Sequence, residues 1–299
     1  MTLNRKLSLL LIAGVTALSA IAVACNDDDD DDDDGGDATP TPAASGTEPA
    51  GAIDISGVDE LSDGTLTIGS DIAYAPIEFL DTATNEPVGL DIDVANAIGE
   101  LLGVEVVFEN AAFDGLLPAL DAERYDVIMS AMTASDERKE QVDFVEYFNA
   151  GSGIIVAAAN PEGITAIEDL CGLSVAVQEG TVQVEYLETQ STACTDGGEE
   201  AIDILRFPSD PEAVQALLAG QAAAEMADYP VAAYSATQNE GDIEIITGYQ
   251  FDAAPYGIAV RKSSTAVRDV LQEALDQLIA DGAYAQILDT WNLADGALD

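Results

Sequence analysis

Apolar residues change their spacing along the chain in a way that predicts alternating strands and helices. In the segment TLTIGS, Leu66 and Ile68 alternate with polar residues, as in a strand that is buried on one side. From residue 91 to residue 102, Val94, Ile98 and Leu102 instead fall on one face of a helix. The folded part of the chain is therefore expected to begin with a strand followed by a helix.

The same alternation continues to the end of the chain. Strands are predicted at residues 104–108, 125–133, 173–178, 202–207, 222–228 and 242–247, and helices at residues 116–120, after 180, at 210–220, 229–236 and 264–282, and around Trp291. Repeated β-α-β units predict an α/β fold, and the restart after residue 159 predicts a second sheet with helices of its own. The amphipathic helix 264–282, with Ser264 as N-cap and Gly282 as C-cap, is expected to pack back on the first sheet.

The N-terminal segment has the pattern of an export signal. Arg5 and Lys6 precede an almost uncharged run to residue 24, which ends in small residues before Cys25. Residues 1–24 are predicted to be a signal peptide; the alternative is an uncleaved membrane helix, which the hydroxyl residues within the run disfavour. The stretch resembles a bacterial lipobox, which implies that Cys25 becomes the lipid-modified first residue of the mature protein.

Residues 25–60 have the composition of a tether. Eight consecutive aspartates, residues 27–34, are followed by a segment rich in Pro, Ala and Gly. Such a composition buries too little apolar surface to fold, so the segment is predicted to be disordered, with folding from residue 61 onward. The alternative for the aspartate run is calcium binding.

The charge of the chain limits its partners. With 57 acidic residues, 9 basic residues and no histidine, the formal net charge is −48. Such a chain repels phosphate groups, which excludes nucleic acid and anionic lipid as partners, so the membrane anchor is expected to be covalent lipid. No metal-site spacing and no cofactor motif is present in the sequence. No later segment is apolar for long enough to cross a bilayer.

The three cysteines fit an exported protein. If Cys25 carries lipid, Cys171 and Cys194 remain as a pair that an oxidising compartment would join in a disulfide bond. The alternative is two free, buried thiols.

Seven segments resemble, in order and spacing, the extracellular solute-binding proteins of the polar amino-acid type (family 3), which are substrate-binding lipoproteins of ABC transporters. The segments are GTLTIGSDIAYAPIEF, GLDIDVANAIGELLG, FDGLLPAL, YDVIMSAMTASDERKEQVDF, DLCGLSVAVQEGT, AEMADYPVAAY and DGAYAQILDTWNL. The resemblance covers about residues 64–293. It implies the type II periplasmic-binding-protein fold, with mainly parallel sheets in two lobes that two hinge strands join. Residues 61–151 and 249–299 would form lobe one and residues 152–248 lobe two, with crossings near residues 149–156 and 248–254.

The resemblance also implies a site for the charged ends of an amino acid. The ligand's carboxylate needs a cation and N–H donors. Arg138 occupies the place of the family's carboxylate-binding arginine, and Gly180 and Thr181 would offer backbone N–H groups and a hydroxyl from the other lobe. Without the resemblance, composition would favour an ordinary surface arginine at Arg138 and an ordinary helix start at Gly180 and Thr181.

The remaining predicted ligand contacts concern the ammonium group and the side chain. Asp228 resembles the family's ammonium-binding aspartate, with Thr133 and the backbone of Ala131 as further acceptors; its alternative role is to cap a helix. The other predicted contacts, all implied by the resemblance, are the aromatic walls Tyr74 and Phe113, whose alternative is simple core, and the side-chain contacts Asp71, Ser130, Gln178 and Gln183. A carboxylate at Asp71 favours a basic or polar amino acid.

The resulting expectation is a monomeric, extracytoplasmic lipoprotein, anchored to the cell membrane, that delivers a free amino acid to an ABC permease. No catalytic residue, metal or cofactor is predicted, and the protein is not expected to be an enzyme. Two alternatives are an exported dehydratase on the same fold, acting on cyclohexadienyl acids such as arogenate, and a ligand-sensing lipoprotein.

Overall fold

A computed structural model describes residues 53–298 of the chain. The predicted signal peptide, Cys25, the aspartate run and the tether up to residue 52 lie outside the described residues. Among the residues described, no helix is both long enough and apolar enough to cross a membrane.

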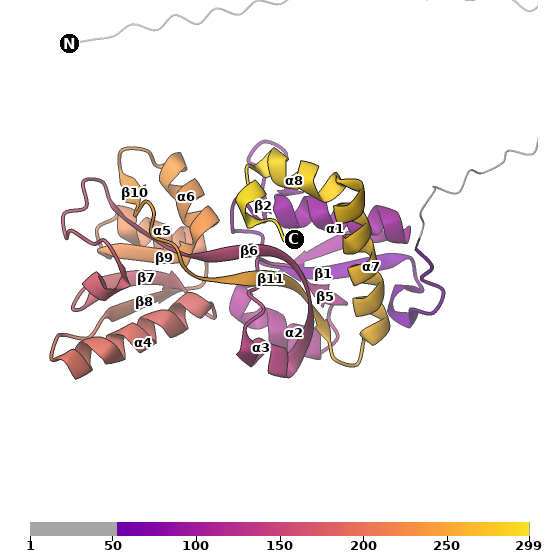
Figure 1. Ribbon diagram of the computed structural model, residues 1–299, viewed down its shortest axis with the longest axis horizontal. Coiled ribbons are helices and arrows are strands. Elements are labelled where there is room, and N and C mark those ends of the chain that lie inside the picture. Colours follow the sequence, from indigo (N-terminus) through magenta and orange to yellow (C-terminus); the bar gives the residue numbers. More distant parts are fainter. Residues whose placement is uncertain (1–52, 299) are drawn as a thin grey trace, which may run out of the picture. The chain divides into compact units, whose positions relative to one another are not determined.

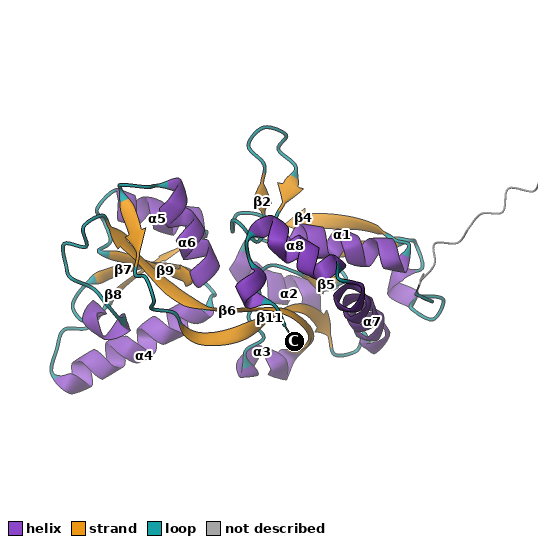
Figure 2. Cartoon of the chain, turned by 45° about the horizontal axis from the view of Figure 1, so that its top comes forward, coloured by secondary structure: helices purple, strands orange, loops and turns teal. Residues whose placement is uncertain are grey.

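Two lobes are present, each an α/β unit built on its own part of a sheet (Figures 1 and 2). Lobe one contains β1 (Thr65–Ser70), β2 (Phe79–Leu80), β3 (Pro87–Val88), α1 (Leu90–Leu102), β4 (Glu105–Asn110), α2 (Leu116–Asp121), β5 (Val127–Ile128), α3 (Asp136–Gln141), α7 (Thr265–Asp281) and α8 (Ala283–Trp291). Lobe two contains β7 (Ser174–Gln178), α4 (Val182–Gly197), β8 (Asp203–Phe207), α5 (Asp210–Leu218), β9 (Ala224–Asp228), α6 (Tyr229–Gln238) and β10 (Ile243–Ile245). The two-lobed α/β fold expected from the sequence is thus confirmed.

Two long strands, β6 (Val142–Ala157) and β11 (Phe251–Arg261), run from one lobe into the other. They pair antiparallel with each other, and the sheet order is β4-β1-β5-β11-β6-β9-β7-β8, with β10 also on β6. The pairs β1–β4, β1–β5, β7–β8 and β7–β9 are parallel. Both crossing strands are longer than the crossings predicted near residues 149–156 and 248–254. The reason is that each strand also pairs with other strands inside a lobe.

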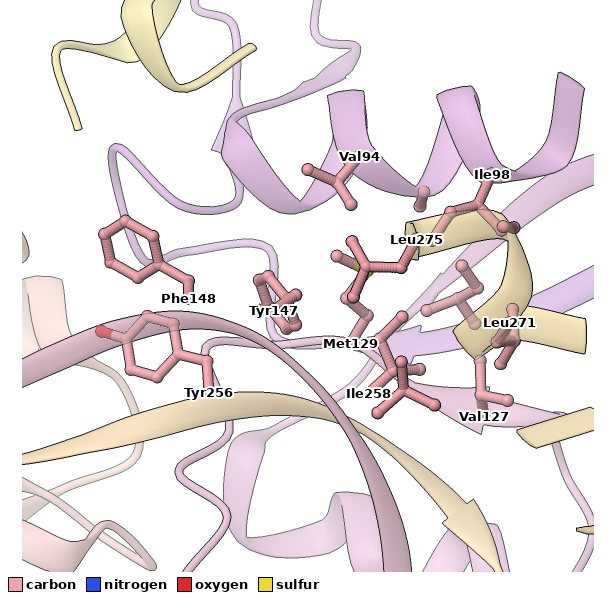
Figure 3. Close-up of a cluster of buried hydrophobic side chains, with 14 of the residues drawn as sticks. Val94, Ile98, Val127, Met129, Tyr147, Phe148, Tyr256, Ile258, Leu271 and Leu275 are labelled. Carbon is pink, nitrogen blue, oxygen red and sulfur yellow. The ribbon is translucent and has the colours of Figure 1, made fainter. Parts of the chain in front are cut away.

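The core of lobe one joins residues from both ends of the chain. Figure 3 shows Val94 and Ile98 of α1 close to Leu271 and Leu275 of α7, and all four belong to one buried apolar cluster. Helix α7 ends at Gly282, whose φ of 83° is a left-handed conformation that suits glycine. The expected packing of the C-terminal helices on the first lobe is confirmed. The side chain of Ser264, however, makes no capping hydrogen bond.

The core of lobe two is separate and includes a disulfide bond. Its apolar cluster contains Ile154, Val175, Leu187 and Met226. Cys171 and Cys194 are joined, with Cα atoms 5.6 Å apart, and the bond ties the segment before β7 to helix α4. The predicted pairing is confirmed, and the alternative of two free thiols is wrong.

Two predicted boundaries differ from the structure. Ile53 and Val58 are buried in the core of lobe one, and the N–H of Ile53 donates to the carbonyl of Leu101 at 3.0 Å, so folding begins before residue 61. Residues 53–60 are therefore not part of a disordered tether, because their apolar side chains complete the surface of α1. The strand expected at residues 125–133 is confined to β5, because the backbone turns at Ala131, where φ is 44°.

Candidate functional site

A small cavity lies between the two lobes, beside the crossing strands. It is lined by eleven of the twelve predicted ligand contacts and also by Glu78 and Val182; the eleven are Asp71, Tyr74, Phe113, Ser130, Ala131, Thr133, Arg138, Gln178, Thr181, Gln183 and Asp228. The free space of about 10 Å³ is roughly the room that one water molecule needs. An amino acid can therefore enter only when the lobes part or the lining side chains move.

Arg138 is the cationic residue of the lining. It lies in α3 and is 8% exposed, and its Nη1 donates to the carbonyl of Thr133 at 2.9 Å. Nη2 donates across the cleft to the carbonyl of Gly180 at 3.0 Å, and the guanidinium lies 5.4 Å from the centre of the Phe113 ring. Burial lowers the pKa of Arg138 from its ordinary value. The ring of Phe113 thus contacts the arginine and also lines the cavity, and its role as a wall against the ligand stays a prediction.

Gly180 and Thr181 form the opposite face of the site. Gly180 has a φ of 80°, and a Cβ on it would lie 3.0 Å from Cα of Asp114 in lobe one, so a side chain here would obstruct closure. Thr181 precedes α4, and its hydroxyl donates to the carbonyl of Gln178 at 2.8 Å instead of capping the helix. Gly180 itself is not part of the cavity lining. The first N–H groups of α4 have no partner within the helix and suit an anion.

Asp228 lies at the end of β9 and connects the lobes. Its Oδ2 accepts a hydrogen bond from the hydroxyl of Tyr74 at 3.1 Å, and its Oδ1 accepts one from Nε2 of Gln183 at 2.8 Å. Its backbone N–H donates to the same Tyr74 oxygen at 3.0 Å. Burial raises the pKa of the Asp228 carboxyl to about 6, against the effect of these hydrogen bonds. Tyr74 is therefore a polar contact between the lobes as well as part of the cavity lining.

A second carboxylate, Asp71, follows β1 on the lobe-one side. Its Oδ2 accepts a hydrogen bond from Nε2 of Gln178 in lobe two at 2.6 Å. Burial raises the pKa of Asp71 to about 6, although the Gln178 bond lowers it. The backbone N–H of Asp71 donates to Oγ of Ser130 at 2.9 Å, which places Ser130 between Asp71 and Glu78.

The comparisons with known proteins agree with this geometry. Residues 66–294 match the family model for bacterial extracellular solute-binding proteins, family 3. The chain belongs to this family.

Named relatives of this family 3 protein include several amino-acid-binding proteins. The arginine-binding protein ArgT of Corynebacterium glutamicum is 33% identical over 237 residues, which cover 79% of this chain and 77% of the relative. A solved ancestral arginine-binding protein bound to arginine is 36% identical, with a TM-score of 0.71, over 76% of this chain and 98% of that one. A solved ancestral amino-acid-binding protein, described as a precursor of cyclohexadienyl dehydratase, is 34% identical with the same TM-score, over 79% of this chain and 99% of that one.

The structure adds acidic residues of this family 3 protein that the sequence analysis missed. Glu78 lines the cavity, is 1% exposed, and accepts a hydrogen bond on Oε1 from Oγ of Ser130 at 2.8 Å. Its other carboxylate oxygen has no hydrogen-bond partner among the described residues. Behind it, Asp91 accepts from the N–H of Ala131 at 3.0 Å and from the hydroxyl of Tyr147 at 2.6 Å. The N–H of Ala131 is thus used within lobe one, which leaves its carbonyl for the predicted ammonium contact.

The electrostatics of the site of this family 3 protein favour a cation. Burial raises the pKa of Glu78 well above its ordinary value and the pKa of Asp91 to about 7, because each charge would lie away from water, and the nearby carboxylates Asp91, Asp71 and Asp228 raise the pKa of Glu78 further. The lining thus has three buried carboxyl groups, Asp71, Glu78 and Asp228, but one cationic side chain. A cationic group placed among them would favour their ionised forms.

Among the described residues, four hydrogen bonds span the cleft and hold the lobes together. One joins Asp71 to Gln178, two join Tyr74 to the side chain and the backbone N–H of Asp228, and one joins Arg138 to the carbonyl of Gly180. Each involves a residue predicted to contact the ligand, so ligand contacts and lobe-to-lobe contacts use the same polar groups. Opening of the cleft must break all four.

Proposed function

We propose that this protein binds a free amino acid with a positively charged side chain between its lobes and delivers it to an ABC importer. One observation carries the proposal: Asp71, Glu78 and Asp228 are buried in one cavity with a single cationic residue, Arg138. The ligand's carboxylate would pair with Arg138 and its ammonium with Asp228. Asp71 and Glu78 then remain for a guanidinium or ammonium on the side chain.

The relatives support the same ligand class. Both the Corynebacterium protein and the solved ancestral protein are named for arginine. A guanidinium presents its donors in a planar fork that can pair with carboxylates in two directions, which suits Asp71 and Glu78 together. We expect a dissociation constant of about micromolar size, which corresponds to a binding free energy of roughly 8 kcal/mol. The charge-assisted contacts need to supply this free energy.

The finer features of the transport role belong to the same proposal. The protein would be exported, lipid-anchored through Cys25, and monomeric, with the permease as its membrane partner. It would have no catalytic activity, because the chain has no histidine, the commonest general acid and base. One of the solved relatives is described as a precursor of cyclohexadienyl dehydratase, and arogenate is therefore included among the ligands to be tested.

The test is ligand-dependent melting of the protein without its predicted signal peptide, after bound ligand is removed by partial unfolding and refolding. Arginine, lysine, histidine, glutamine, cystine, leucine and arogenate would each be added. Arginine or lysine at a hundred times its dissociation constant should stabilise the protein by about 2.7 kcal/mol. Arogenate should neither stabilise the protein nor be converted to phenylalanine.

Variants locate the site. Arg138→Ala should abolish the shift for every ligand, whereas Glu78→Gln should weaken arginine binding more than glutamine binding. Arg268→Ala is the matched control, because Arg268 forms surface ion pairs with Asp143 and Asp269. An equal shift with Arg138→Ala, or a preference for leucine over arginine, would overturn the proposal.

A further inference from the structure

A second acidic pair lies in lobe two, behind the ligand cavity. Glu225 is the second residue of β9 and is fully buried, and Asp210, the first residue of α5, is 5% exposed. Their carboxyl groups are close enough to hydrogen-bond to each other. Glu225 is three residues before Asp228 on the same strand, so their side chains point to opposite faces of the sheet, but the charge of Asp228 still acts on both members of the pair.

This pair has no donor from the rest of the described residues. Neither carboxylate oxygen of Glu225 has a hydrogen-bond partner. Two ionised carboxylates only accept hydrogen bonds, so a bond between Glu225 and Asp210 requires that one of them carries a proton. Burial without such a bond would leave acceptors unsatisfied at a considerable cost in stability.

The charged groups around the pair disfavour a second negative charge. Asp228 acts on both members, and Asp71 in lobe one acts on Asp210. Tyr74 is close enough to be affected by both carboxyls, and Arg138 acts on Asp228 as the cation of the region. Burial raises the pKa of Asp210 to about 7 and that of Glu225 well above its ordinary value.

We propose that Asp210 and Glu225 form a buried proton-binding site that is linked to the ligand site and contributes to its preference for cations. The inference rests on the proposed function for its ligand, a cationic amino acid. The pair alternates between a neutral form with two protons and a singly charged form with one shared proton. When a cation binds between Asp71 and Asp228, the singly charged form is favoured, one carboxylic O–H bond breaks, and the proton passes to water or buffer.

A route for that proton is present. Asp210 lines a cavity of about 220 Å³, together with Ala73, Pro211 and Gln215. A proton can therefore exchange through the Asp210 side of the pair while Glu225 stays enclosed. By reciprocity, a protonated pair weakens cation binding by the same factor by which the bound cation weakens proton binding.

The first experiment is calorimetric titration of the protein with arginine at pH 6.5, in two buffers that differ in ionisation enthalpy. The difference in apparent heat gives the number of protons released per arginine bound. Glu225→Gln supplies an amide that donates to Asp210 without any proton from solvent, so this variant should release fewer protons than the wild type. Glu212→Gln, on the exposed side of α5, is the matched control and should release as many as the wild type.

The dissociation constants should show the same linkage. Between pH 7.5 and 5.5, arginine binding to the wild type should weaken about tenfold more than binding to Glu225→Gln, which corresponds to one additional pKa unit of linkage. A double variant, Asp210→Asn with Glu225→Gln, has no charge at this pair at any pH. It should have a lower ratio of arginine affinity to glutamine affinity than the wild type. Equal proton release and equal pH profiles in wild type and Glu225→Gln would overturn the linkage.

Infrared difference spectroscopy of the ligand-free protein tests the proton site independently of the ligand. Acidification from pH 8 to pH 5 should produce a carbonyl band of protonated carboxylic acid, part of which is missing in Glu225→Gln and retained in Glu212→Gln. An unchanged band in Glu225→Gln would overturn the proton site. If no cationic amino acid binds to any variant, the proposed function fails, and the infrared result still decides whether the pair holds a proton.

Discussion

The two lobes contain buried carboxyl pairs that resemble each other in composition and differ in their hydrogen-bond donors. In lobe one, Glu78 and Asp91 receive hydrogen bonds from Ser130, Tyr147 and the N–H of Ala131. In lobe two, Glu225 receives none from the described residues. The comparison shows that burial alone does not determine what an acidic residue does. Donors hold the first pair in one geometry, whereas the second pair depends on a proton.

The largest expected effect comes from Asp91→Ala, which removes the acceptor in lobe one. The N–H of Ala131 and the hydroxyl of Tyr147 would both lose their partner in a buried place, at about 1–3 kcal/mol each. We expect the free energy of unfolding at pH 7 to fall by about 4 kcal/mol in urea denaturation.

Asp93→Ala is the control for this change in the same helix. Asp93 is only partly buried and accepts one hydrogen bond from Nε1 of Trp291 at 2.8 Å. Its loss should cost about 1 kcal/mol. If Asp91→Ala costs no more than Asp93→Ala, the donors of lobe one do not hold the pair as described.

A smaller effect, of opposite sign, is expected for Glu225→Gln in lobe two. Asp210 has an ordinary pKa of 3.8 and a pKa of about 7 in the folded protein, so its contribution to stability is complete below the ordinary value and is lost as the pH rises through about 7. The variant needs no proton, because its amide can donate to Asp210. It should therefore exceed the wild type in stability by about 1–2 kcal/mol at pH 8, with the difference disappearing by pH 5.

Melting curves at pH 5, 6.5 and 8 check this prediction. The wild type itself should melt higher at pH 5 than at pH 8, since burial also raises the pKa values of Asp71 and Asp228 to about 6. A wild-type melting temperature that is highest at pH 8 would contradict the sign of the effect.

The smallest effect is expected for Tyr147→Phe, which makes lobe one more like lobe two. The change removes one donor from Asp91 and leaves the N–H of Ala131 in place, for a loss of about 1 kcal/mol. The Tyr147 bond lowers the pKa of Asp91, so its removal should raise the pKa of that carboxyl further and increase the pH dependence of stability. An unchanged pH dependence would show that Tyr147 does not control the charge of Asp91.

Much of the fold could be predicted because its elements depend on local periodicity. The helices that became α1 and α7 have continuous apolar faces, and Gly282 ends the second of them. The length of β6 could not be predicted in this way, because its pairing with β11 in one lobe and β9 in the other depends on segments far away in the chain. The burial of Ile53 likewise depends on a contact with Leu101.

The site residues that occur in family motifs could be predicted from the sequence. Buried acidic residues outside the predicted set were missed, because their signal was a charged residue at a position expected to be buried. Asp91 is three and seven residues before Val94 and Ile98, on the apolar face of its helix, and Glu225 interrupts the apolar strand AAAEMAD. Both positions are unusual for a solvated carboxylate. Their partners, Tyr147 and Asp210, come from other elements and could not be assigned from the sequence.

The route of the chain through the lobes also affects the order in which the protein can fold during synthesis. Every element between β6 and β11 belongs to lobe two, which is one continuous stretch of chain. Lobe one remains incomplete until β11 and α7 have been made, because Leu271 and Leu275 of α7 fill its core. A nascent chain that stops before residue 251 can therefore enclose the smaller lobe while the larger one still exposes apolar surface, which is the stage at which chaperones would recognise it.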